Sequence, residues 1–216
     1  MNDLRPLIFV VDDEPSICIA LERLFRSVDL EVQTFCSAQS FLEAHRPDLP
    51  GCLVLDVRLP DLSGLEVQGR LSEQGADIPI VFITAHGDIP MSVKAIKAGA
   101  VEFLSKPFKE QDLLNAVQQA IEQHRVARQL RAEVQKFRNQ YSSLTPRERE
   151  VFPLVTAGLL NKEVAAQIGT SERTVKIHRA RVMKKMRAQS LAHLVHIAEK
   201  LNLSSFKHHS RTTKVQ

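Results

Sequence analysis

The chain has 216 residues, of which 44% are hydrophobic and 25% are charged, a composition typical of a globular protein with one large or two modest domains. Its apolar runs are far shorter than the roughly 18–20 residues that cross a bilayer, and its N-terminus lacks a signal-peptide pattern, so we expect a cytoplasmic protein outside the membrane. Residues 1–120 carry a net charge of −8 and residues 121–216 carry +12. This asymmetry favours a basic, nucleic-acid-binding second half, although a solvated basic face would give the same numbers.

Three cysteines, Cys18, Cys36 and Cys52, are odd in number, widely spaced and flanked by apolar residues. A disulfide framework or a zinc site needs paired or clustered cysteines. We therefore expect reduced thiols that are mostly buried.

Short apolar runs alternate with amphipathic stretches through residues 1–120. The runs predicted as strands are Leu7–Val11, Leu30–Phe35, Cys52–Leu55, Ile80–Ile83 and Val101–Leu104. Their unbroken hydrophobicity is typical of parallel strands covered on both faces. Five βα repeats predict a doubly wound α/β domain with a parallel sheet, in which ligands bind beyond the carboxyl ends of the strands.

A charged segment without Gly or Pro follows, and it predicts a helical linker over residues 121–141. Residues 142–203 predict an all-α domain with helices at 146–157, 161–168, 171–186 and 190–201. Thr145 is the expected N-cap of the first of these, with Pro146 at the first helical position and Glu148 completing a capping box. Asn161 is expected to cap the second. Residues 204–216 are expected to form a disordered tail.

Charged and hydroxyl side chains stand immediately after four of the five predicted strands. Asp12 and Asp13 follow the first strand, Asp56 the third, Thr84 the fourth and Lys106 the fifth. The carboxyl ends of parallel strands share one edge of the sheet, so these side chains are expected to converge there. Neighbouring carboxylates repel one another unless a cation lies between them, and an oxygen-only ligand set favours Mg²⁺.

This pocket has the groups that phosphoryl transfer requires. A carboxylate can accept a phosphoryl group, and the transfer depends on positioning and on stabilising the charge of the equatorial oxygens. Asp56 is the expected acceptor, and Asp12 and Asp13 are expected to hold Mg²⁺ with the backbone carbonyl of Arg58 as a further ligand. Thr84 would donate to one phosphoryl oxygen, and Lys106 would pair with another.

Each of these residues also has a structural explanation when it is taken singly. Asp12 or Asp13 can cap the first helix, Thr84 can cap the fourth, and a lone Lys106 is usually a solvated charge. Capping does not explain why a lysine and three carboxylates converge, so the set favours a functional site.

Four ordered segments resemble the signatures of bacterial response-regulator receiver domains: "VVDDE", "LVLDVRLPDLSGLE", "FITAHGD" and "FLSKPF". The resemblance covers residues 5–120. It implies phosphorylation of Asp56 by a sensor histidine kinase, a cis peptide bond between Lys106 and Pro107, and an aromatic switch at Phe103 that moves with Thr84. It also implies a homodimer through the helix near residues 89–98 and the fifth strand. Phe103 taken alone is more often a core residue.

The basic half resembles the DNA-binding domain of the LuxR/NarL class in the segments "LTPREREVF" and "GLLNKEVAAQIGTSERTVKIHRARVMKKM". Its short break between the second and third helices is typical of a helix-turn-helix, whose third helix enters the major groove. In that helix Val175, Val182 and Met186 can face the core. The residues expected to project outward are Thr174, Lys176, His178, Arg179, Arg181, Lys184 and Lys185.

Taken as a whole, the chain resembles the FixJ-type branch and is similar to the styrene- and toluene-catabolism regulators. The resemblance implies DNA contacts from Lys162, Thr174, Val175, Lys176, His178 and Arg179. Met186–Arg187–Ala188 departs from the pattern, in which Leu–Gly is expected. Alternatively the domain is a basic bundle that binds protein, with His178 in the core and Val175 packed rather than contacting a thymine methyl.

These observations predict a transcription factor, not an enzyme, whose receiver domain gates DNA binding. Phosphorylation would bring two copies together on promoter DNA, where RNA polymerase is the further partner and activation the expected effect. A phosphotransfer enzyme or phosphatase is one alternative, disfavoured because haloacid-dehalogenase-type phosphatases place Asp-x-Asp after the first strand, whereas Asp12 and Asp13 are consecutive. A receiver with an RNA-binding or protein-binding output domain is another.

Overall fold

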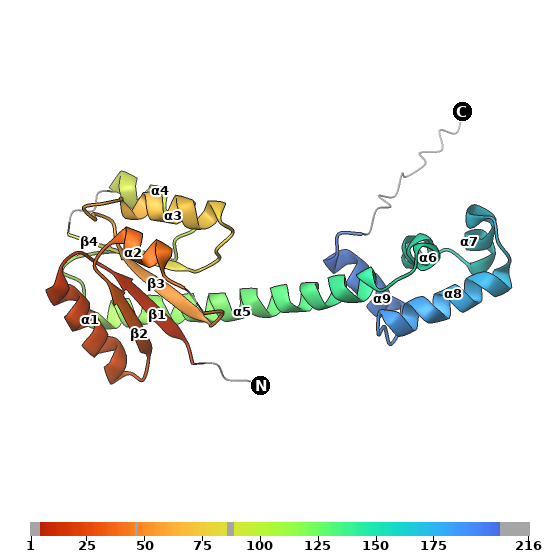
Figure 1. The fold of residues 1–216 in the computed structure, drawn as a ribbon, viewed down its shortest axis with the longest axis horizontal. Coiled ribbons are helices and arrows are strands. Elements are labelled where there is room, and N and C mark those ends of the chain that lie inside the picture. The colour runs from red at the N-terminus through yellow and green to blue at the C-terminus, as the bar shows by residue number, and fades with distance from the viewer. Residues whose placement is uncertain (1–4, 46, 86–88, 204–216) are drawn as a thin grey trace, which may run out of the picture. The chain divides into compact units, whose positions relative to one another are not determined.

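The computed structural model describes residues 5–45, 47–85 and 89–203 (Figure 1). The tail predicted to be disordered, residues 204–216, lies outside the described residues. The chain divides into two compact units, residues 1–129 and residues 130–216, and each is described by itself below. In the part of the chain that the structure describes, no helix is long and apolar enough to cross a membrane.

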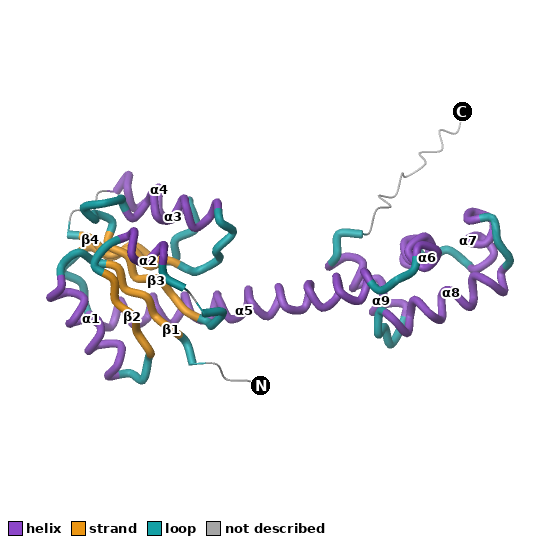
Figure 2. The backbone as a smooth tube through the Cα atoms, viewed as in Figure 1, coloured by secondary structure: helices purple, strands orange, loops and turns teal. Residues whose placement is uncertain are grey.

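Unit 1 contains a sheet of five parallel strands in the order β2-β1-β3-β4-β5 (Figure 2). The strands are β1 (Leu7–Val11), β2 (Glu31–Phe35), β3 (Gly51–Asp56), β4 (Ile80–Thr84) and β5 (Glu102–Ser105). The predicted doubly wound parallel sheet is therefore confirmed, with strand ends that differ from the predicted ones by one residue at most. Every residue of β1, β3 and β4 is buried, as their continuous hydrophobicity predicts.

Helices cover both faces of this sheet. The helices of unit 1 are α1 (Pro15–Ser27), α2 (Ala38–Glu43), α3 (Gly64–Glu73), α4 (Ile89–Lys97) and the first part of α5 (Glu110–Ser142). Successive side chains of a strand point to opposite faces, so β1 supplies Leu7 and Phe9 to one apolar core and Ile8 and Val10 to another. The first core packs against α2, α3 and α4, and the second packs against α1 and α5.

The helix α5 continues without a break from unit 1 through the segment predicted as a linker. Polar contacts hold the part of α5 around residues 124–128 to the residues at the start of β3. The backbone N–H of Gly51 donates to Nδ1 of His124 at 3.0 Å, and the guanidinium of Arg128 donates to the carboxylate and to the backbone carbonyl of Asp48. These contacts make residues 121–129 part of unit 1.

Unit 2 is the all-α domain that the sequence predicts. It contains α6 (Pro146–Thr156), α7 (Asn161–Ile168), α8 (Glu172–Lys185), α9 (Leu191–Lys200) and the last turns of α5. Its core is built around Phe152, Val164, Val182 and Leu194. Phe137, which lies in the segment predicted as a linker, is buried in this same core.

Capping residues set the helix starts in unit 2. The predicted capping box of α6 is confirmed: Glu148 N–H donates to Oγ1 of Thr145 at 3.4 Å, and Thr145 N–H donates to the carboxylate of Glu148 at 2.9 Å. The predicted cap of α7 is wrong, because Asn161 is the first helical residue and Leu160 is the N-cap. Leu160 has no side-chain acceptor, and its own N–H donates to the Glu163 carboxylate at 2.7 Å.

The three cysteines are free thiols, and two of them, Cys18 and Cys52, are buried. Burial raises the pKa of Cys18 to about 11 and raises that of Cys52 further. Both therefore remain protonated at neutral pH. The expectation that the thiols are mostly buried is confirmed, and Cys36 is the exposed one.

Candidate functional site

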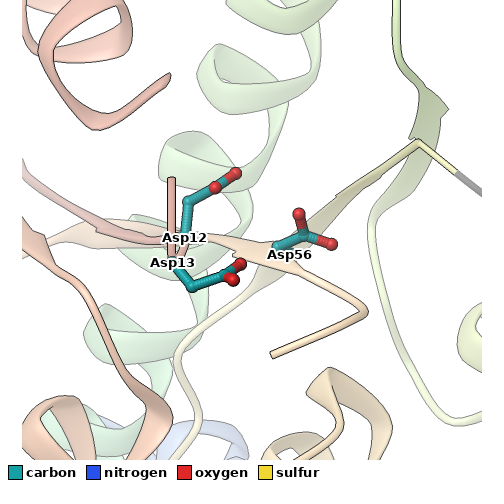
Figure 3. Close-up of side chains that lie close together, drawn as sticks. All are labelled: Asp12, Asp13 and Asp56. Carbon is teal, nitrogen blue, oxygen red and sulfur yellow. The ribbon is translucent and has the colours of Figure 1, made fainter. Parts of the chain in front are cut away.

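Three carboxylates meet at the carboxyl edge of the sheet (Figure 3). Asp12 and Asp13 directly follow β1, Asp56 ends β3, and these two strands are paired so that Val11 lies opposite Leu55. This register brings one oxygen of each carboxylate within 4.8 Å of the others. Asp12 and Asp56 are buried, whereas Asp13 is exposed and gives access from solvent.

Lys106 supplies the positive charge of this pocket. Its Nζ lies 2.6 Å from Oδ2 of Asp12 and 2.8 Å from Oδ2 of Asp56. The lysine directly follows β5, and its backbone N–H donates to the Thr84 carbonyl at 2.7 Å, which fixes the start of its side chain. The peptide bond between Lys106 and Pro107 is cis, as the resemblance implies.

The charges of the pocket are not balanced by the protein alone. Burial raises the pKa of Asp12, and its hydrogen bonds to Lys106 and to the Glu14 N–H only partly oppose this. Burial alone would lower the pKa of Lys106, but its hydrogen bonds to Asp12 and Asp56 outweigh it and the pKa lies above its usual value. Lys106 is therefore charged, and three carboxylates with one ammonium favour a further cation.

The ligand chemistry fits a hard divalent cation. Among the described residues, this potential metal cluster consists of carboxylates without an imidazole or a thiolate. Oxygen-only sites of this kind suit Mg²⁺ and leave coordination positions for water and phosphate oxygens. One oxygen of Asp56 also accepts the Arg58 N–H at 2.9 Å, which orients the carboxylate.

Thr84 and Phe103 lie on neighbouring strands beside this pocket. Thr84 is the last residue of β4 and is buried, and it is paired with Ser105 in β5. Phe103 lies two residues before Ser105 and is partly buried, with its ring 6.2 Å from that of Phe82. The structure thus brings Thr84 to the edge where Asp56 and Lys106 lie.

The candidate DNA contacts of unit 2 differ in their exposure. Lys162 at the start of α7 and Lys176 on α8 are exposed. Thr174 is partly buried, and its hydroxyl lies 2.9 Å from the Ser171 hydroxyl that caps α8. Arg179 is partly buried and donates to the Asn161 side chain at 3.3 Å, which joins α8 to α7.

Val175 does not lie on the surface, and its expected DNA contact is wrong. Its side chain is completely buried in the core with Val182 and Met186. Ile177 follows two positions later, which is about 200° around the helix, and it is 46% exposed. The spacing of Val175, Val182 and Met186 contains this signal, because these three residues lie on one face of a helix and Ile177 lies on the opposite face.

Lys185 does not project freely into solvent as expected. Its Nζ lies 2.6 Å from the carboxylate of Glu148, which is buried, and 3.2 Å from the Ser143 carbonyl. Burial raises the pKa of Glu148, but the hydrogen bonds from Lys185 and Thr145 outweigh it, and the pKa lies below its usual value. Lys185 therefore joins the end of α8 to the start of α6.

His178 is partly buried, and its Nδ1 is buried without a hydrogen-bond partner among the described residues. A buried ring nitrogen without a partner carries a desolvation cost. The expected DNA contact of His178 stays a prediction.

Family models match both units. The model of the response regulator receiver domain matches residues 8–118. The model of bacterial regulatory proteins of the luxR family matches residues 142–198. The first contains the acidic pocket, and the second contains α8.

Relatives match nearly the whole chain. It is 51% identical over 211 residues to nodulation protein W of Bradyrhizobium diazoefficiens, covering 98% of this chain and 92% of that protein. It is 46% identical over 201 residues to the response regulator protein TmoT of Ectopseudomonas mendocina, covering 93% and 91%. The solved structure of the response regulator StyR has a TM-score of 0.82 and 50% identity, covering 91% of this chain and 99% of that one. The predicted resemblance is confirmed.

Proposed function

The chain belongs to the response regulators that join a receiver domain to a luxR-type DNA-binding domain, and from this membership we propose that it controls transcription when a sensor histidine kinase phosphorylates Asp56. It is a transcription factor rather than a catalytic enzyme. Its site of action would be the bacterial cytoplasm, where promoter DNA and RNA polymerase are found. The observation that carries the proposal is the convergence of Asp12, Asp13 and Asp56, the first and last of which contact Lys106.

Each residue of the pocket has a separate task in the proposed transfer. A carboxylate oxygen of Asp56 forms the new bond to phosphorus as the bond from phosphorus to the kinase histidine breaks. Asp12, Asp13, Asp56 and the Arg58 carbonyl would hold Mg²⁺, which supplies charge stabilisation for the phosphoryl oxygens. Lys106 would exchange its contact with Asp56 for a phosphoryl oxygen, and the Thr84 hydroxyl would donate to another.

The switch follows from these new contacts. A phosphoryl group adds about two negative charges and several acceptor oxygens, which would draw Thr84 towards the pocket. Phe103 would occupy the space that Thr84 leaves, and the face formed by α4 and β5 would change. This face has an apolar stripe at Ile89, Val93 and Ile96, which are 79%, 44% and 44% exposed. A second copy would bind there, since such an exposed stripe is typical of an interaction surface.

The output is DNA binding through α8. Lys162 and Lys176 are exposed and would neutralise phosphates, and the partly buried Thr174, His178 and Arg179 would supply further contacts to the DNA. Ile177 takes the role expected of Val175, contacting a thymine methyl in the major groove. Two output domains of a dimer would bind two half-sites and activate transcription by recruiting RNA polymerase.

The test is DNA binding with and without beryllofluoride, a phosphoryl mimic, for the native chain and for Asp56→Asn. We expect beryllofluoride to tighten binding by the native chain and to leave the variant unchanged. Equal affinity in all four conditions would show that Asp56 does not gate the output.

A second variant separates the two tasks. Lys176→Ala is expected to weaken DNA binding about tenfold, because one phosphate contact is lost, and to leave phosphorylation of Asp56 intact. Loss of phosphorylation in this variant would contradict the division of tasks between the units.

A further inference from the structure

Gln68 on α3 makes polar contacts that no step of the proposed switch uses. Its side chain is 6% exposed, and its Nε2 lies 3.2 Å from the Ala95 carbonyl and 3.1 Å from the Ala98 carbonyl. The NH₂ group of the amide has two hydrogens, so it can donate to both carbonyl oxygens at once. Gln68 therefore joins α3 to the C-terminal end of α4, and the two helices are neighbours in Figure 1.

The carbonyls that Gln68 binds belong to the end of a helix. The last carbonyls of a helix have no partner within it and need donors from elsewhere. Gly99, at a φ of 96°, turns the chain so that the Ala100 N–H donates to the Ala95 carbonyl at 3.1 Å. The Ala95 carbonyl thus accepts hydrogen bonds from the Ala100 N–H and from Gln68. These two donors hold the C-terminal end of α4.

The rest of α4 has little apolar contact with the domain. Of its nine residues, all of which the structure describes, Ala95 is the one whose side chain is buried, and Met91 packs partly against the core. Ile89, Val93 and Ile96 face outward. An element with so few buried apolar contacts has low local stability, so two hydrogen bonds to a buried amide are a large part of what holds it.

The N-terminal end of α3 lies against the phosphoacceptor. Gly64 begins the helix, and its N–H donates to the Val57 carbonyl at 2.8 Å. A side chain at Gly64 would place its first carbon 2.6 Å from the carbonyl oxygen of Asp56, a distance that no real contact shows. Gln68 lies four residues after Gly64 in the same helix, so α3 connects the backbone of Asp56 to the amide that holds α4.

We propose that Gln68 is a positioning residue that fixes the C-terminal end of α4 to α3, so that α4 responds to the pocket as a helix held at Ala95 and Ala98. Holding one end limits α4 to a small set of positions, which is what allows phosphorylation to select one of them. The proposal rests on the proposed function in one respect: it assigns Gln68 to the regulation of the α4 and β5 face.

Gln68→Met tests the hydrogen bonds without removing the side chain, because methionine has a similar length and shape and lacks a donor. Gln68→Glu keeps the shape but turns a carboxylate towards two carbonyl oxygens. Gln74→Met is the matched control, since Gln74 is exposed at the end of the same helix. Amide hydrogen exchange is measured across the unphosphorylated chain, and dimerisation is measured with and without beryllofluoride.

We expect exchange in residues 93–98 to become about tenfold faster in Gln68→Met and faster still in Gln68→Glu, while β1, β3 and the Gln74→Met control remain unchanged. We also expect the tightening of the dimer by beryllofluoride to fall at least about threefold in Gln68→Met. If Gln68 acts through its hydrogen bonds, an apolar side chain of similar volume cannot replace it. If Gln68 only fills space, Gln68→Met should behave like the native chain.

Unchanged exchange in α4, or faster exchange spread evenly over unit 1, would overturn the positioning role of Gln68. Faster exchange in α4 with a native response to beryllofluoride would overturn its part in regulation. A native chain that does not dimerise with beryllofluoride would count against the proposed function instead, and the exchange measurement, which needs no dimer, would still decide whether Gln68 holds α4.

Discussion

Lys106 occupies a central position among the residues of the pocket. Its ammonium bridges Asp12 and Asp56, at 2.6 and 2.8 Å, and is the positive charge that these two carboxylates share. Asp12 remains costly to ionise, since burial raises its pKa above the usual 3.8. The folded chain therefore binds a proton at Asp12 more readily than the unfolded chain does.

Stabilisation by Mg²⁺ is expected to depend on pH for this reason. The contribution of Asp12 to stability is full below about pH 3.8 and is lost as the pH rises through its raised folded pKa. At about pH 7.5 the metal meets three carboxylates, and at about 30 times its dissociation constant it should raise the free energy of unfolding by about 2 kcal/mol. At about pH 4.5 the gain should be smaller, because a proton competes for Asp12. Calorimetry with and without Mg²⁺ measures both values.

Asp12→Asn is the control for this prediction, because it removes the titrating group and keeps its shape. Its response to Mg²⁺ should be weaker at neutral pH and should change less between the two pH values. An equal gain at both pH values in the native chain would mean that Asp12 is not a metal ligand.

Substitutions at Val175 and Ile177 separate the core face of α8 from its exposed face. Val175→Ala should lower the free energy of unfolding of unit 2 by about 2 kcal/mol, because two methyl groups leave a filled core. Ile177→Ala should change stability by less than about 0.5 kcal/mol and weaken DNA binding about tenfold. Urea unfolding and a DNA titration separate the two. The reverse pattern would place Val175 at the DNA and Ile177 in the core.

At the residue scale, the sequence predicts which side chains form the pocket, but it predicts less well which side chains of α8 face outward. Asp12, Asp56 and Lys106 follow strands, and the carboxyl ends of parallel strands have one possible location. A helix gives no such constraint, because the face that meets the core depends on what packs against it. The sequence therefore predicts a basic helix but does not show that Lys185 pairs with Glu148.

Among the elements, α6 and α8 depend on each other through Glu148. This carboxylate is 1% exposed, accepts from Thr145 at the start of α6 and accepts from Lys185 at the end of α8. A buried carboxylate without its cation is costly. The charged pair of Glu148 and Lys185 thus joins the two helices in addition to their contacts in the core of unit 2.

Lys185→Met should lower the free energy of unfolding of unit 2 by about 2–3 kcal/mol, because it leaves Glu148 buried without a counter-charge. Lys184→Met is the control, since Lys184 is exposed, and it should change stability by less than about 0.5 kcal/mol. Urea unfolding measures both variants. Equal effects would mean that the pair contributes nothing beyond surface charge.

The pair of Glu148 and Lys185 also makes the stability of unit 2 depend on pH in the acid range. The pKa of Glu148 lies below its usual 4.5, so its contribution is present above that pH and is lost as the pH falls through the folded value. In Lys185→Met this acid-dependent part should be reduced, because the cation that lowers the pKa is gone.

At the element scale, most boundaries followed from the sequence because capping and strand patterns are local. The Thr145 capping box is confirmed, and the strands end within one residue of their predicted positions. The N-cap of α7 was missed, since Leu160 has no capping side chain and the stabilising group is Glu163. The contact of Gln68 with α4 spans 27 and 30 positions, and no local pattern indicates it.

At the scale of the whole molecule, α5 belongs to both units. His124 and Arg128 bind residues of unit 1, whereas Phe137 is buried in unit 2. The sequence predicts a helix here and an acidic and a basic half, because both depend on composition and periodicity. It does not predict that Phe137 and Tyr141, four residues apart on this helix, complete a core, since their spacing does not show what packs against them.

A fragment of residues 130–216 should therefore be more stable than one of residues 142–216. The shorter fragment lacks Phe137 and Tyr141, whose rings pack on the core, and it should lose about 3 kcal/mol of unfolding free energy. Phe137→Ala in the longer fragment should reproduce most of that loss, which thermal unfolding would reveal. Equal stability of the two fragments would show that α5 contributes nothing to unit 2.

The burial of Phe137 also bears on how such proteins can be recombined. A gene fusion that exchanges receivers at the boundary suggested by the luxR-family match, near residue 142, would separate the output domain from part of its own core. A junction before Leu130 falls within α5 and leaves Phe137 with the core that it completes. A receiver exchanged at that position therefore leaves the output domain with its whole core.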